Sequence, residues 1–345
     1  MVRKNAIGTT STVPAEVLLA AGHVPIDVNN LFISSPDRER LVVRAERDGF
    51  PLNSCQWIKG IYGTCMEQGI DTVLCVTTGD CSNTLMLMEV LKLKGLRTIP
   101  FGFPSEPAET LMQGALVGLA ETLGTGMPAA ESVRESLAGA RRLAETLDRL
   151  TWQDGLVSGF ENHYWLVSSS DFLGDVASYE TGLSDLLARA ERRAPYADEM
   201  LRLAYIGVPP VFAQDLHAYI EQNGARVVFN EVQRQFSMPG EHEGLAAQYT
   251  RYTYPYSVFG RLADILPQLE LRRVDGVIHY VQAFCHRGIA DIIMRHAIRR
   301  PMLTLEGNAD YILTQHARTR VEAFLDVLRR QRRAGAIPGG RAGGR

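Results

Sequence analysis

The spacing of apolar positions in the first part of the chain predicts strands that alternate with helices. Residues 71–78 and 96–101 form short apolar runs that are typical of buried strands, and residues 23–28 also look extended. Apolar residues at helical spacing, with capping residues or proline at the start and glycine at the end, predict helices over residues 13–22, 54–69 and 81–94. This alternation indicates a parallel sheet with right-handed crossovers.

The pattern changes to almost purely helical between residues 108 and 192, and the alternation returns after residue 199. The predicted strands of this last part are 201–206, 226–229, 276–281 and 301–306, and the predicted helices are 211–222, 260–269 and 319–333. We therefore expect an α/β fold with two Rossmann-like parallel-sheet domains that face a cleft and are joined by a helical connector. The expected parts are residues 1–107, 108–198 and 199–335, followed by a disordered tail at 336–345.

Composition and charge narrow the class of protein. A length of 345 residues suits two domains, and 46% hydrophobic residues suffice for two cores. The net charge of -3 gives no reason to expect nucleic acid or an anionic membrane as a partner. The beginning of the sequence has no signal-peptide pattern, no segment is apolar for the length of a membrane span, and the five cysteines do not form a disulfide framework. We expect a cytoplasmic protein.

Three of the five cysteines stand where the sequence predicts a helix to begin. These are Cys55, Cys81 and Cys285, and the last two also follow the carboxyl ends of predicted strands, where ligands bind in open α/β sheets. A helix N-terminus lowers the pKa of a thiol and so favours the thiolate that binds metals. Cys65, late in a helix, and Cys75, inside a strand, are interpreted as small buried hydrophobic residues.

Several kinds of site remain compatible with these cysteines. Five buried reduced thiols are the simplest alternative. A zinc site of three cysteines with His286 or His279 is chemically feasible, although the usual C-x-x-C pairs are absent. A cysteine hydrolase that uses Cys285 is disfavoured, because the adjacent histidine would point away from it on a helix. An iron-sulfur cluster with three thiolate ligands would leave one iron with an exchangeable position.

The chain resembles the D-component family of 2-hydroxyacyl-CoA dehydratases, which includes benzoyl-CoA reductase subunits and double-cubane-cluster proteins. In the first half, the matching segments are Val13-Pro14-Ala15-Glu16, Ala20-Ala21-Gly22, Cys55 with Lys59-Gly60, Asp71-Thr72-Val73-Leu74 and Asp80-Cys81. In the second half they are Ile206-Gly207-Val208-Pro209, Arg226-Val227-Val228 with Glu231, Asp275-Gly276-Val277-Ile278, Phe284-Cys285, Leu305-Glu306-Gly307 and 319–324. The similarity follows the family's order over nearly the whole chain.

This resemblance implies a [4Fe-4S] cluster bound by Cys55, Cys81 and Cys285, or alternatively an [8Fe-9S] double cubane. It also implies a separate ATP-hydrolysing iron-sulfur activator that injects one low-potential electron, after which an acyl-CoA thioester becomes a ketyl radical anion and loses its hydroxyl group. The chain would be the iron-sulfur subunit of a lyase, or of a related benzoyl-CoA reductase-like oxidoreductase, and would pair with a sister subunit or a second copy. The alternatives are a double-cubane reductase of small molecules, a non-catalytic electron carrier, and a two-lobed binding protein that has no metal.

The sequence itself contains no G-x-x-x-x-G-K-[ST] motif, so the ATP dependence is expected to lie in the partner. It departs from the family pattern where Asp80 precedes Cys81 and where Asn308 replaces a common aspartate, which leaves the substrate open.

Other polar residues have two interpretations each. Glu306, at the end of a predicted strand, is a candidate acid or base, or a cap for the next helix. The loop with Arg251, Tyr252 and Tyr256, and the group Glu161, Asn162, His163 and Trp165, could contact substrate or form packed, satisfied networks. Arginines of the last predicted helix, Arg318, Arg320, Arg329 and Arg330, are expected on its solvated face.

Overall fold

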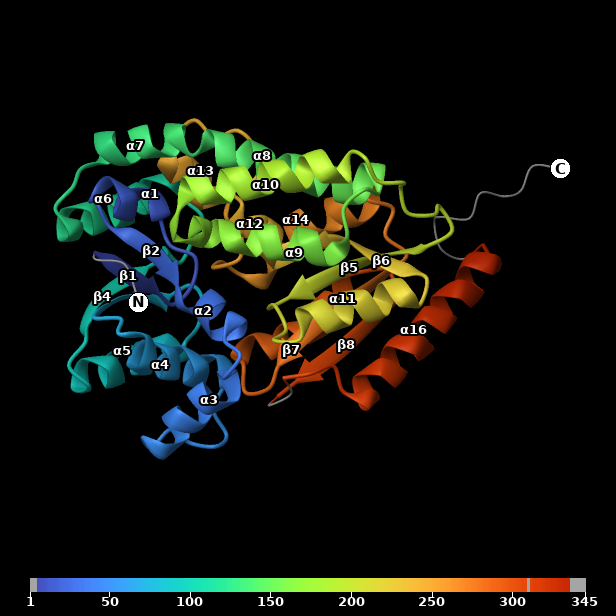
Figure 1. Ribbon diagram of the computed structural model, residues 1–345, viewed down its shortest axis with the longest axis horizontal. Coiled ribbons are helices and arrows are strands. Elements are labelled where there is room, and N and C mark those ends of the chain that lie inside the picture. Colours follow the sequence, from blue (N-terminus) through green and yellow to red (C-terminus); the bar gives the residue numbers. More distant parts are fainter. Residues whose placement is uncertain (1–4, 309–310, 336–345) are drawn as a thin grey trace. The chain divides into compact units, whose positions relative to one another are not determined.

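The computed structural model describes residues 5–308 and 311–335, and its chain divides into two compact units (Figure 1). Unit 1 consists of residues 1–144, 167–184 and 235–257, and unit 2 of residues 145–166, 185–234 and 258–345. Each unit contains one four-stranded sheet, and every strand pairing is parallel. The expected tail at 336–345 lies outside the described residues.

The sheet of unit 1 has the strand order β2-β1-β3-β4. Its strands are β1 (Ala6–Thr9), β2 (Val24–Asp27), β3 (Thr72–Thr78) and β4 (Arg97–Gly102). The segments predicted as extended or as strands are confirmed, but β1 was not predicted. It contains Gly8 and Thr9, which are not typical of an apolar strand, and continues into the buried Thr10. The Thr10 hydroxyl group accepts a hydrogen bond from the Val76 amide at 3.0 Å, which satisfies it in the core.

Four helices cover one face of this sheet. They are α2 (Val28–Ser34), α3 (Arg38–Arg47), α4 (Gln56–Gln68) and α5 (Asn83–Leu93), whereas α1 (Ala15–Ala20) connects β1 to β2. Their apolar residues form one hydrophobic cluster with Val73 and Cys75 of β3. The apolar pattern predicted no helix between residues 23 and 53, so α2 and α3 were not expected. Helix α3 is strongly polar on one side and buries only Leu41, Val42 and Ala45 on the other.

The predicted helical segment is confirmed. It contains α6 (Glu109–Leu123), α7 (Met127–Ser136), α8 (Ala138–Arg149), a π-helical turn (Leu150–Asp154), α9 (Gly159–Val167), two 3-10 turns (Ser168–Ser170 and Phe172–Gly174) and α10 (Val176–Ala190). The compact units divide this segment between them, and α12 (Glu231–Phe236) leads to residues 235–257 with α13 (Leu245–Arg251), which belong to unit 1. The continuous boundaries 1–107, 108–198 and 199–335 thus remain a prediction about domains, and they differ from these packing units.

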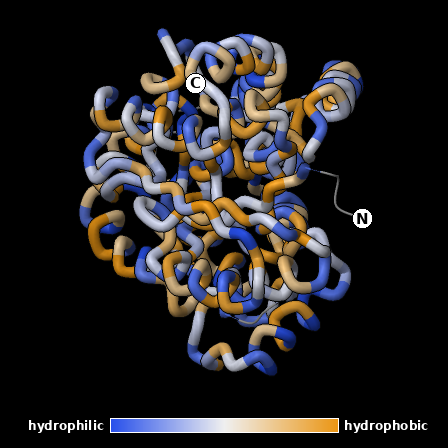
Figure 2. Tube along the Cα trace, turned by 90° about the vertical axis from the view of Figure 1, so that its left-hand side faces the viewer, coloured by the Kyte–Doolittle hydropathy of each residue, from blue (hydrophilic) through white to orange (hydrophobic). Residues whose placement is uncertain are grey.

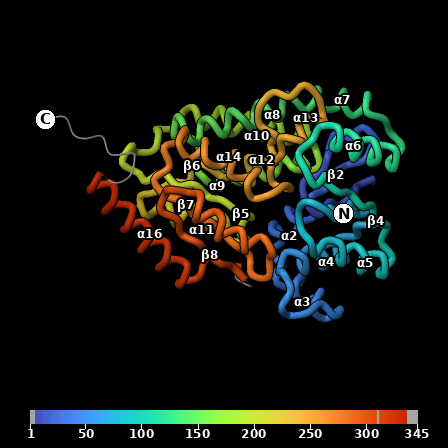
Figure 3. Tube along the Cα trace, turned by 180° about the vertical axis from the view of Figure 1, so that it is seen from behind, coloured from blue at the N-terminus to red at the C-terminus, as the bar shows by residue number. Residues whose placement is uncertain are grey.

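The sheet of unit 2 repeats the topology of the first, with the order β6-β5-β7-β8. Its strands are β5 (Leu201–Gly207), β6 (Ala225–Asn230), β7 (Gly276–Gln282) and β8 (Met302–Gly307), and all four were predicted. One face packs against α11 (Ala213–Gln222) and α16 (Gln315–Arg333), and the other against α14 (Val258–Leu271) and α15 (Asp291–Ala297). Figure 3 shows α16 beside β8.

The arrangement of residues along these helices explains the layers. Hydrophobic and hydrophilic positions are mixed along the helices (Figure 2), so that each can bury one side and expose the other. Strand β5 is buried on both faces: Leu203 and Tyr205 contribute to one cluster, and Ala204 and Ile206 to the other. Successive side chains of a strand point to opposite faces, and in a parallel sheet covered by helices on both faces both sets of side chains are apolar. The two Rossmann-like sheets expected from the sequence are therefore confirmed.

Candidate functional site

Cys55 stands at the beginning of α4, as the sequence predicted. It is the N-cap residue of the helix, with φ −57° and ψ 130°, and its carbonyl oxygen accepts the Lys59 amide at 3.2 Å. One turn later, the buried Lys59 ammonium group is 2.7 Å from a carboxylate oxygen of Glu46 and donates to the Leu52 carbonyl oxygen at 3.2 Å. These contacts fix the first turn of α4, and Cys55 with it.

Cys81 follows the carboxyl end of β3 by three residues. The chain turns at Gly79, whose φ of +96° favours glycine, and a Cβ atom there would lie 2.8 Å from Phe103. Helix α5 begins at Asn83 with Ser82 as its N-cap residue, so the prediction that the helix begins at Cys81 was two residues early. The Cys81 carbonyl oxygen still accepts the Thr84 amide, at 3.1 Å, in the turn that leads into α5.

Cys285 occupies the equivalent position in unit 2. It follows the carboxyl end of β7 by three residues, as Cys81 follows β3. It caps a 3-10 segment (His286–Ala290) that precedes α15, whereas the sequence analysis expected an α-helix directly after it. Phe284, the residue before it, has a φ of +63° although it is not glycine, a conformation that is uncommon and concentrated at functional sites.

The strand order places both positions beside a change of winding direction. In the order β2-β1-β3-β4, the chain goes from β1 to β2 on one side of β1 and then returns to β3 on the other side, so the direction changes between β1 and β3. In the order β6-β5-β7-β8 it changes in the same way between β5 and β7. Ligands of doubly wound sheets bind outside the carboxyl ends of the strands at this switch point. Cys81 and Cys285 follow the strands that border it.

The two other thiols differ from these three. Cys65 is 2% exposed and Cys75 is 0% exposed, which confirms the prediction that both are buried. Burial raises the pKa of Cys65 far above its ordinary value, and burial raises the pKa of Cys75 to about 12. Both thiols therefore stay protonated at neutral pH. Cys81 and Cys285 are half-buried, and Cys55 is 5% exposed at its helix start.

The structure brings Cys55 and Cys81 to one hydrophobic cluster of unit 1, in which Cys55 is a member and Cys81 packs against it. Cys285 belongs to unit 2. Among residues 5–308 and 311–335, no three histidine, cysteine, aspartate or glutamate side chains already converge as a metal site. The donor chemistry fits an iron-sulfur cluster, because thiolates are its usual ligands, and the two protonated thiols are not needed for a set of three.

Glu306 lies next to the strand end that leads to Cys285. It is exposed near the carboxyl end of β8, and its partner in the sheet register is Val281 of β7. The Ala283 amide donates to the Gly307 carbonyl oxygen at 2.7 Å, so the segment that carries Cys285 is tied to β8. The alternative role of Glu306 as a cap is excluded for α16, because Thr314 caps that helix with its side chain.

A charged network behind this edge of unit 2 was missed by the sequence analysis. The buried Glu231 carboxylate binds Arg261 through two contacts of 2.7 and 2.8 Å and accepts the Gly207 amide at 3.1 Å. Burial would raise the pKa of Glu231, but the Arg261 charge keeps it below its ordinary value. His279 of β7 contacts Asp291 of α15 at 2.7 Å. The available signal was Glu231, which lies two residues after the predicted strand 226–229 and directly follows β6 in the structure.

The remaining candidates form satisfied networks inside one unit. Glu161 binds Arg193 twice at 2.7 Å, and Asn162 donates to Asp148 and Thr151. His163 contacts Gln233, and burial lowers its pKa to about 3, so it stays neutral. The tyrosines 252, 254 and 256 are buried in unit 1. Tyr252 packs with Phe103 and Phe236, Tyr254 packs with Phe236, and the Tyr256 hydroxyl group donates to the Tyr249 carbonyl oxygen at 3.4 Å. These contacts favour the packing interpretation for Glu161, Asn162, His163 and the tyrosines, whereas the role of the exposed Arg251 stays a prediction.

These features define a class: α/β proteins with two doubly wound parallel sheets and cysteines at equivalent strand ends. The chain belongs to the family described as 2-hydroxyglutaryl-CoA dehydratase, D-component, whose profile matches residues 10–328. The resemblance deduced from the sequence is thus confirmed, and the chain is a subunit of the 2-hydroxyacyl-CoA dehydratase type. No helix in the described part of the chain has the length and apolar character needed to cross a membrane.

Comparison with individual proteins adds little. No curated protein matches the chain. A solved structure entitled "Periplasmic heme-binding protein BhuT in complex with two hemes (holo-2 form)" is similar to 94% of this chain over 98% of its own length, with 13% sequence identity and a TM-score of 0.21. At this TM-score the similarity supports no statement about the fold or the ligands of this chain.

Proposed function

We propose that this chain is the iron-sulfur subunit of a 2-hydroxyacyl-CoA dehydratase-like enzyme, with Cys55, Cys81 and Cys285 as the cluster ligands. The observation that supports this most is the repeat of Cys81 and Cys285, each three residues beyond the strand that borders a switch point. Two unrelated structural thiols would have no reason to occupy equivalent ligand-binding positions of two sheets. Cys55 at the start of α4 supplies the third thiol.

The proposed cofactor is a [4Fe-4S] cluster, with an [8Fe-9S] double cubane as the alternative. Such a cluster would store a low-potential electron and present an iron with an exchangeable position, which acts as a Lewis acid. The chain's own contribution is to hold three thiolates. It does so with the capped start of α4 at Cys55 and with the turns that β3 and β7 make before Cys81 and Cys285.

Glu306 is the proposed acid or base. Its side chain is exposed at the carboxyl end of β8, the strand bonded to the segment before Cys285, so a substrate bound at that edge could exchange a proton with it. The Arg261 charge outweighs burial and lowers the pKa of Glu231, so this carboxylate stays ionised. Because it binds Arg261 of α14 and the Gly207 amide of β5, Glu231 is proposed to position these elements and not to donate a proton.

The electron is proposed to come from an ATP-hydrolysing iron-sulfur activator, and the substrate to be an acyl-CoA thioester. The reaction would be a dehydration, which makes the enzyme a lyase, or a related reduction of the benzoyl-CoA reductase type. A sister subunit or a second copy of the chain is the proposed partner in the enzyme, and the cytoplasm its location. All of these follow from the family and not from a contact in the structure.

The direct test is the iron and acid-labile sulfide content of the protein purified without oxygen, with its visible absorption spectrum. About four irons per chain support the single cubane, and about eight irons with additional sulfide support the double cubane. We expect Cys81→Ser to lose iron and the visible absorption, and Cys65→Ser, which removes a buried protonated thiol, to keep both. Colourless wild-type protein that stays iron-free after anaerobic reconstitution would refute the proposal.

A further inference from the structure

Unit 2 contains a large basic cavity at the edge of the sheet opposite Cys285. The cavity has a volume of about 1020 Å³ and lies where β5 and β6 begin, whereas Cys285 follows the end of β7. Strands β5, β6 and β7 are parallel, so the amino ends and the carboxyl ends of the strands form two separate edges. The cavity is therefore a different site from the one proposed above, and the inference below does not depend on the proposed function.

Arginine dominates the lining of this cavity. Six arginines contribute to it, namely Arg202, Arg226, Arg273, Arg329, Arg332 and Arg333. Only two carboxylate residues, Asp198 and Glu199, line it with them. Two of these arginines have carboxylate partners outside the lining, Arg329 with Asp326 and Arg332 with Asp275. The remaining four still give the cavity an excess of positive charge, although the whole chain has a net charge of -3.

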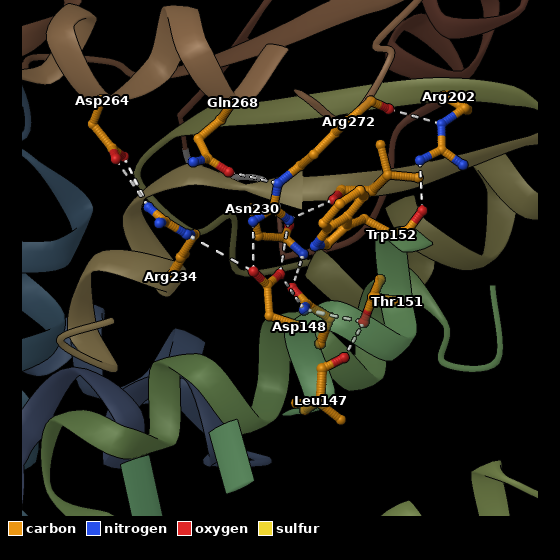
Figure 4. A network of polar contacts seen from close by, with 12 residues as sticks. Leu147, Asp148, Thr151, Trp152, Arg202, Asn230, Arg234, Asp264, Gln268 and Arg272 are labelled. Carbon is orange, nitrogen blue, oxygen red and sulfur yellow. Dashed lines mark hydrogen bonds and ion pairs between the residues drawn. The ribbon is translucent and has the colours of Figure 1, made fainter. Parts of the chain in front are cut away.

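The two innermost arginines are held by neutral groups. Arg226, which is 6% exposed, donates to the Thr151 carbonyl oxygen at 2.6 Å, and its guanidinium carbon lies 5.6 Å from the ring centre of Tyr196. Arg202 donates to the carbonyl oxygens of Arg272 and Trp152 at 2.8 and 2.6 Å, as Figure 4 shows. Within the described part of the chain, neither side chain forms an ion pair. Carbonyl oxygens use some of their donors without neutralising the charge. Asp275 acts on Arg202, and Glu221 and Asp198 act on Arg226, only from beyond ion-pair distance.

The neighbouring charges act on one another. Burial, followed by the repulsion of Arg226, lowers the pKa of Arg202 to about 10, and burial lowers the pKa of Arg226 as well. Arg332 differs from Arg202 and Arg226, because it forms an ion pair with the buried Asp275 and also donates to the Glu199 carbonyl oxygen at 2.7 Å. A multiply charged anion in the cavity would relieve this repulsion.

We propose that this cavity binds a small phosphate-bearing anion with at least two negative charges. Guanidinium groups bind phosphate oxygens through two parallel hydrogen bonds, and several guanidinium groups around one space suit a pyrophosphate group. The volume accommodates a ligand as large as a nucleotide. The phosphate could therefore come from inorganic pyrophosphate, from a nucleoside diphosphate or from coenzyme A.

Titration calorimetry of the full-length protein with inorganic pyrophosphate at low salt tests the proposal. We expect saturable binding of one ion per chain, and weaker binding as salt is added. Arg333→Gln removes a cavity-lining charge, and the matched control Arg330→Gln removes the same charge from an exposed residue of the same helix that does not line the cavity. Arg333→Gln should weaken binding by about tenfold, and Arg330→Gln should leave it nearly unchanged.

Arg226→Gln should weaken binding at least as much as Arg333→Gln, provided that circular dichroism shows a folded protein. If Arg226→Gln does not fold, the pair of exposed variants still decides the matter. Equal weakening by Arg333→Gln and Arg330→Gln would show unspecific surface attraction and overturn the proposal, as would the absence of binding to the wild type. Separate titrations with ADP and coenzyme A identify the source of the phosphate, and malonate binding as tightly as pyrophosphate would refute the phosphate preference.

Discussion

The buried carboxylate of Glu16 in α1 should be one of the strongest single contributors to the stability of unit 1. Its side chain is 0% exposed, and its oxygens accept hydrogen bonds from Gln248 at 2.8 Å and Tyr249 at 2.7 Å and form an ion pair with Arg141. Helices α1, α8 and α13, which are far apart in the sequence, are thereby joined through one side chain. Glu16→Gln keeps the shape but removes the charge that compensates the buried Arg141 guanidinium.

The expected cost is large because one partner of a buried pair is removed. Such changes lower the free energy of unfolding by about 3–5 kcal/mol. The control Glu89→Gln breaks an ion pair with Lys92 in which both side chains are about half exposed, and it should cost less than about 1 kcal/mol. With a urea dependence of about 1–3 kcal/mol per molar, Glu16→Gln should lower the midpoint of unit 1 by at least about 1 M.

The chain has two compact units, and proteins of more than one unit need not unfold in a single step, so the measurement must report each unit by itself. Pulsed hydrogen exchange along a urea titration, read by mass spectrometry in peptides from α13 and α16, reports each unit. Only the α13 transition should move in Glu16→Gln. An α13 midpoint indistinguishable from that of Glu89→Gln would refute the claim that the network stabilises unit 1.

The same variant has a defined pH dependence. Burial would raise the pKa of Glu16, but the Arg141 charge and the hydrogen bonds of Tyr249 and Gln248 hold it below its ordinary value. The ionised carboxylate therefore stabilises the fold above its pKa in the unfolded chain, about 4.3, and this stabilisation is lost as the pH falls through the lower pKa of the folded state. The difference between wild type and Glu16→Gln should shrink in acid.

Two further predictions concern strain and a buried acid pair. Gly207 has a φ of +96°, and a Cβ atom there would lie 2.3 Å from the Tyr280 carbonyl oxygen. Gly207→Ala should therefore destabilise unit 2 by at least about 2 kcal/mol in urea unfolding. The control Gly114→Ala, in helix α6 where nothing lies within reach of a new Cβ atom, should stabilise unit 1 by about 0.5–1 kcal/mol. Burial and the charge of Asp27 raise the pKa of Asp171 to about 7 in the folded protein, whereas in the unfolded chain it is about 3.9. The protonated Asp171 side chain therefore stabilises the fold fully below about pH 3.9, and this stabilisation is lost as the pH rises through about 7. Asp171→Asn should flatten this decline in thermal melts between pH 5 and 8, and parallel profiles would contradict it.

Most of the fold could be predicted because the apolar pattern agrees with the packing. Seven of the eight strands coincide with apolar or extended segments of the sequence, and the helical segment after residue 108 was equally clear. Strand β1 was not predicted, because its buried residues include Gly8 and Thr9 and are followed by Thr10 and Ser11, a run that is typical of a loop. The pattern of a single sequence does not show that a hydroxyl group will find a backbone partner in the core, as Thr10 finds Val76.

The division into packing units could not be predicted for a related reason. Residues 235–257 directly follow residues 185–234 of unit 2 but belong to unit 1, where Gln248 and Tyr249 bind Glu16. Contacts over more than 230 positions in sequence leave no periodic signal, and only the three-dimensional arrangement reveals them. The polar character of this segment predicted a loop, whereas its polar side chains are partners for a buried charge.

The positions of the candidate ligands were the most predictable part of the site, and the structure explains why. Local signals identify strand ends, and in a doubly wound sheet the carboxyl end of a strand beside the switch point is a ligand position regardless of side-chain detail. That rule alone selects Cys81 and Cys285 and rejects Cys75, which lies within β3. The rule cannot select Cys55, because the position of Cys55 relative to the sheet depends on how α4 packs. For Cys55 the support comes from its N-cap position in α4 and from the hydrophobic cluster that it shares with Cys81. Serine variants of Cys55 and Cys81 should therefore lose iron alike, since both thiols lie at one hydrophobic cluster of unit 1.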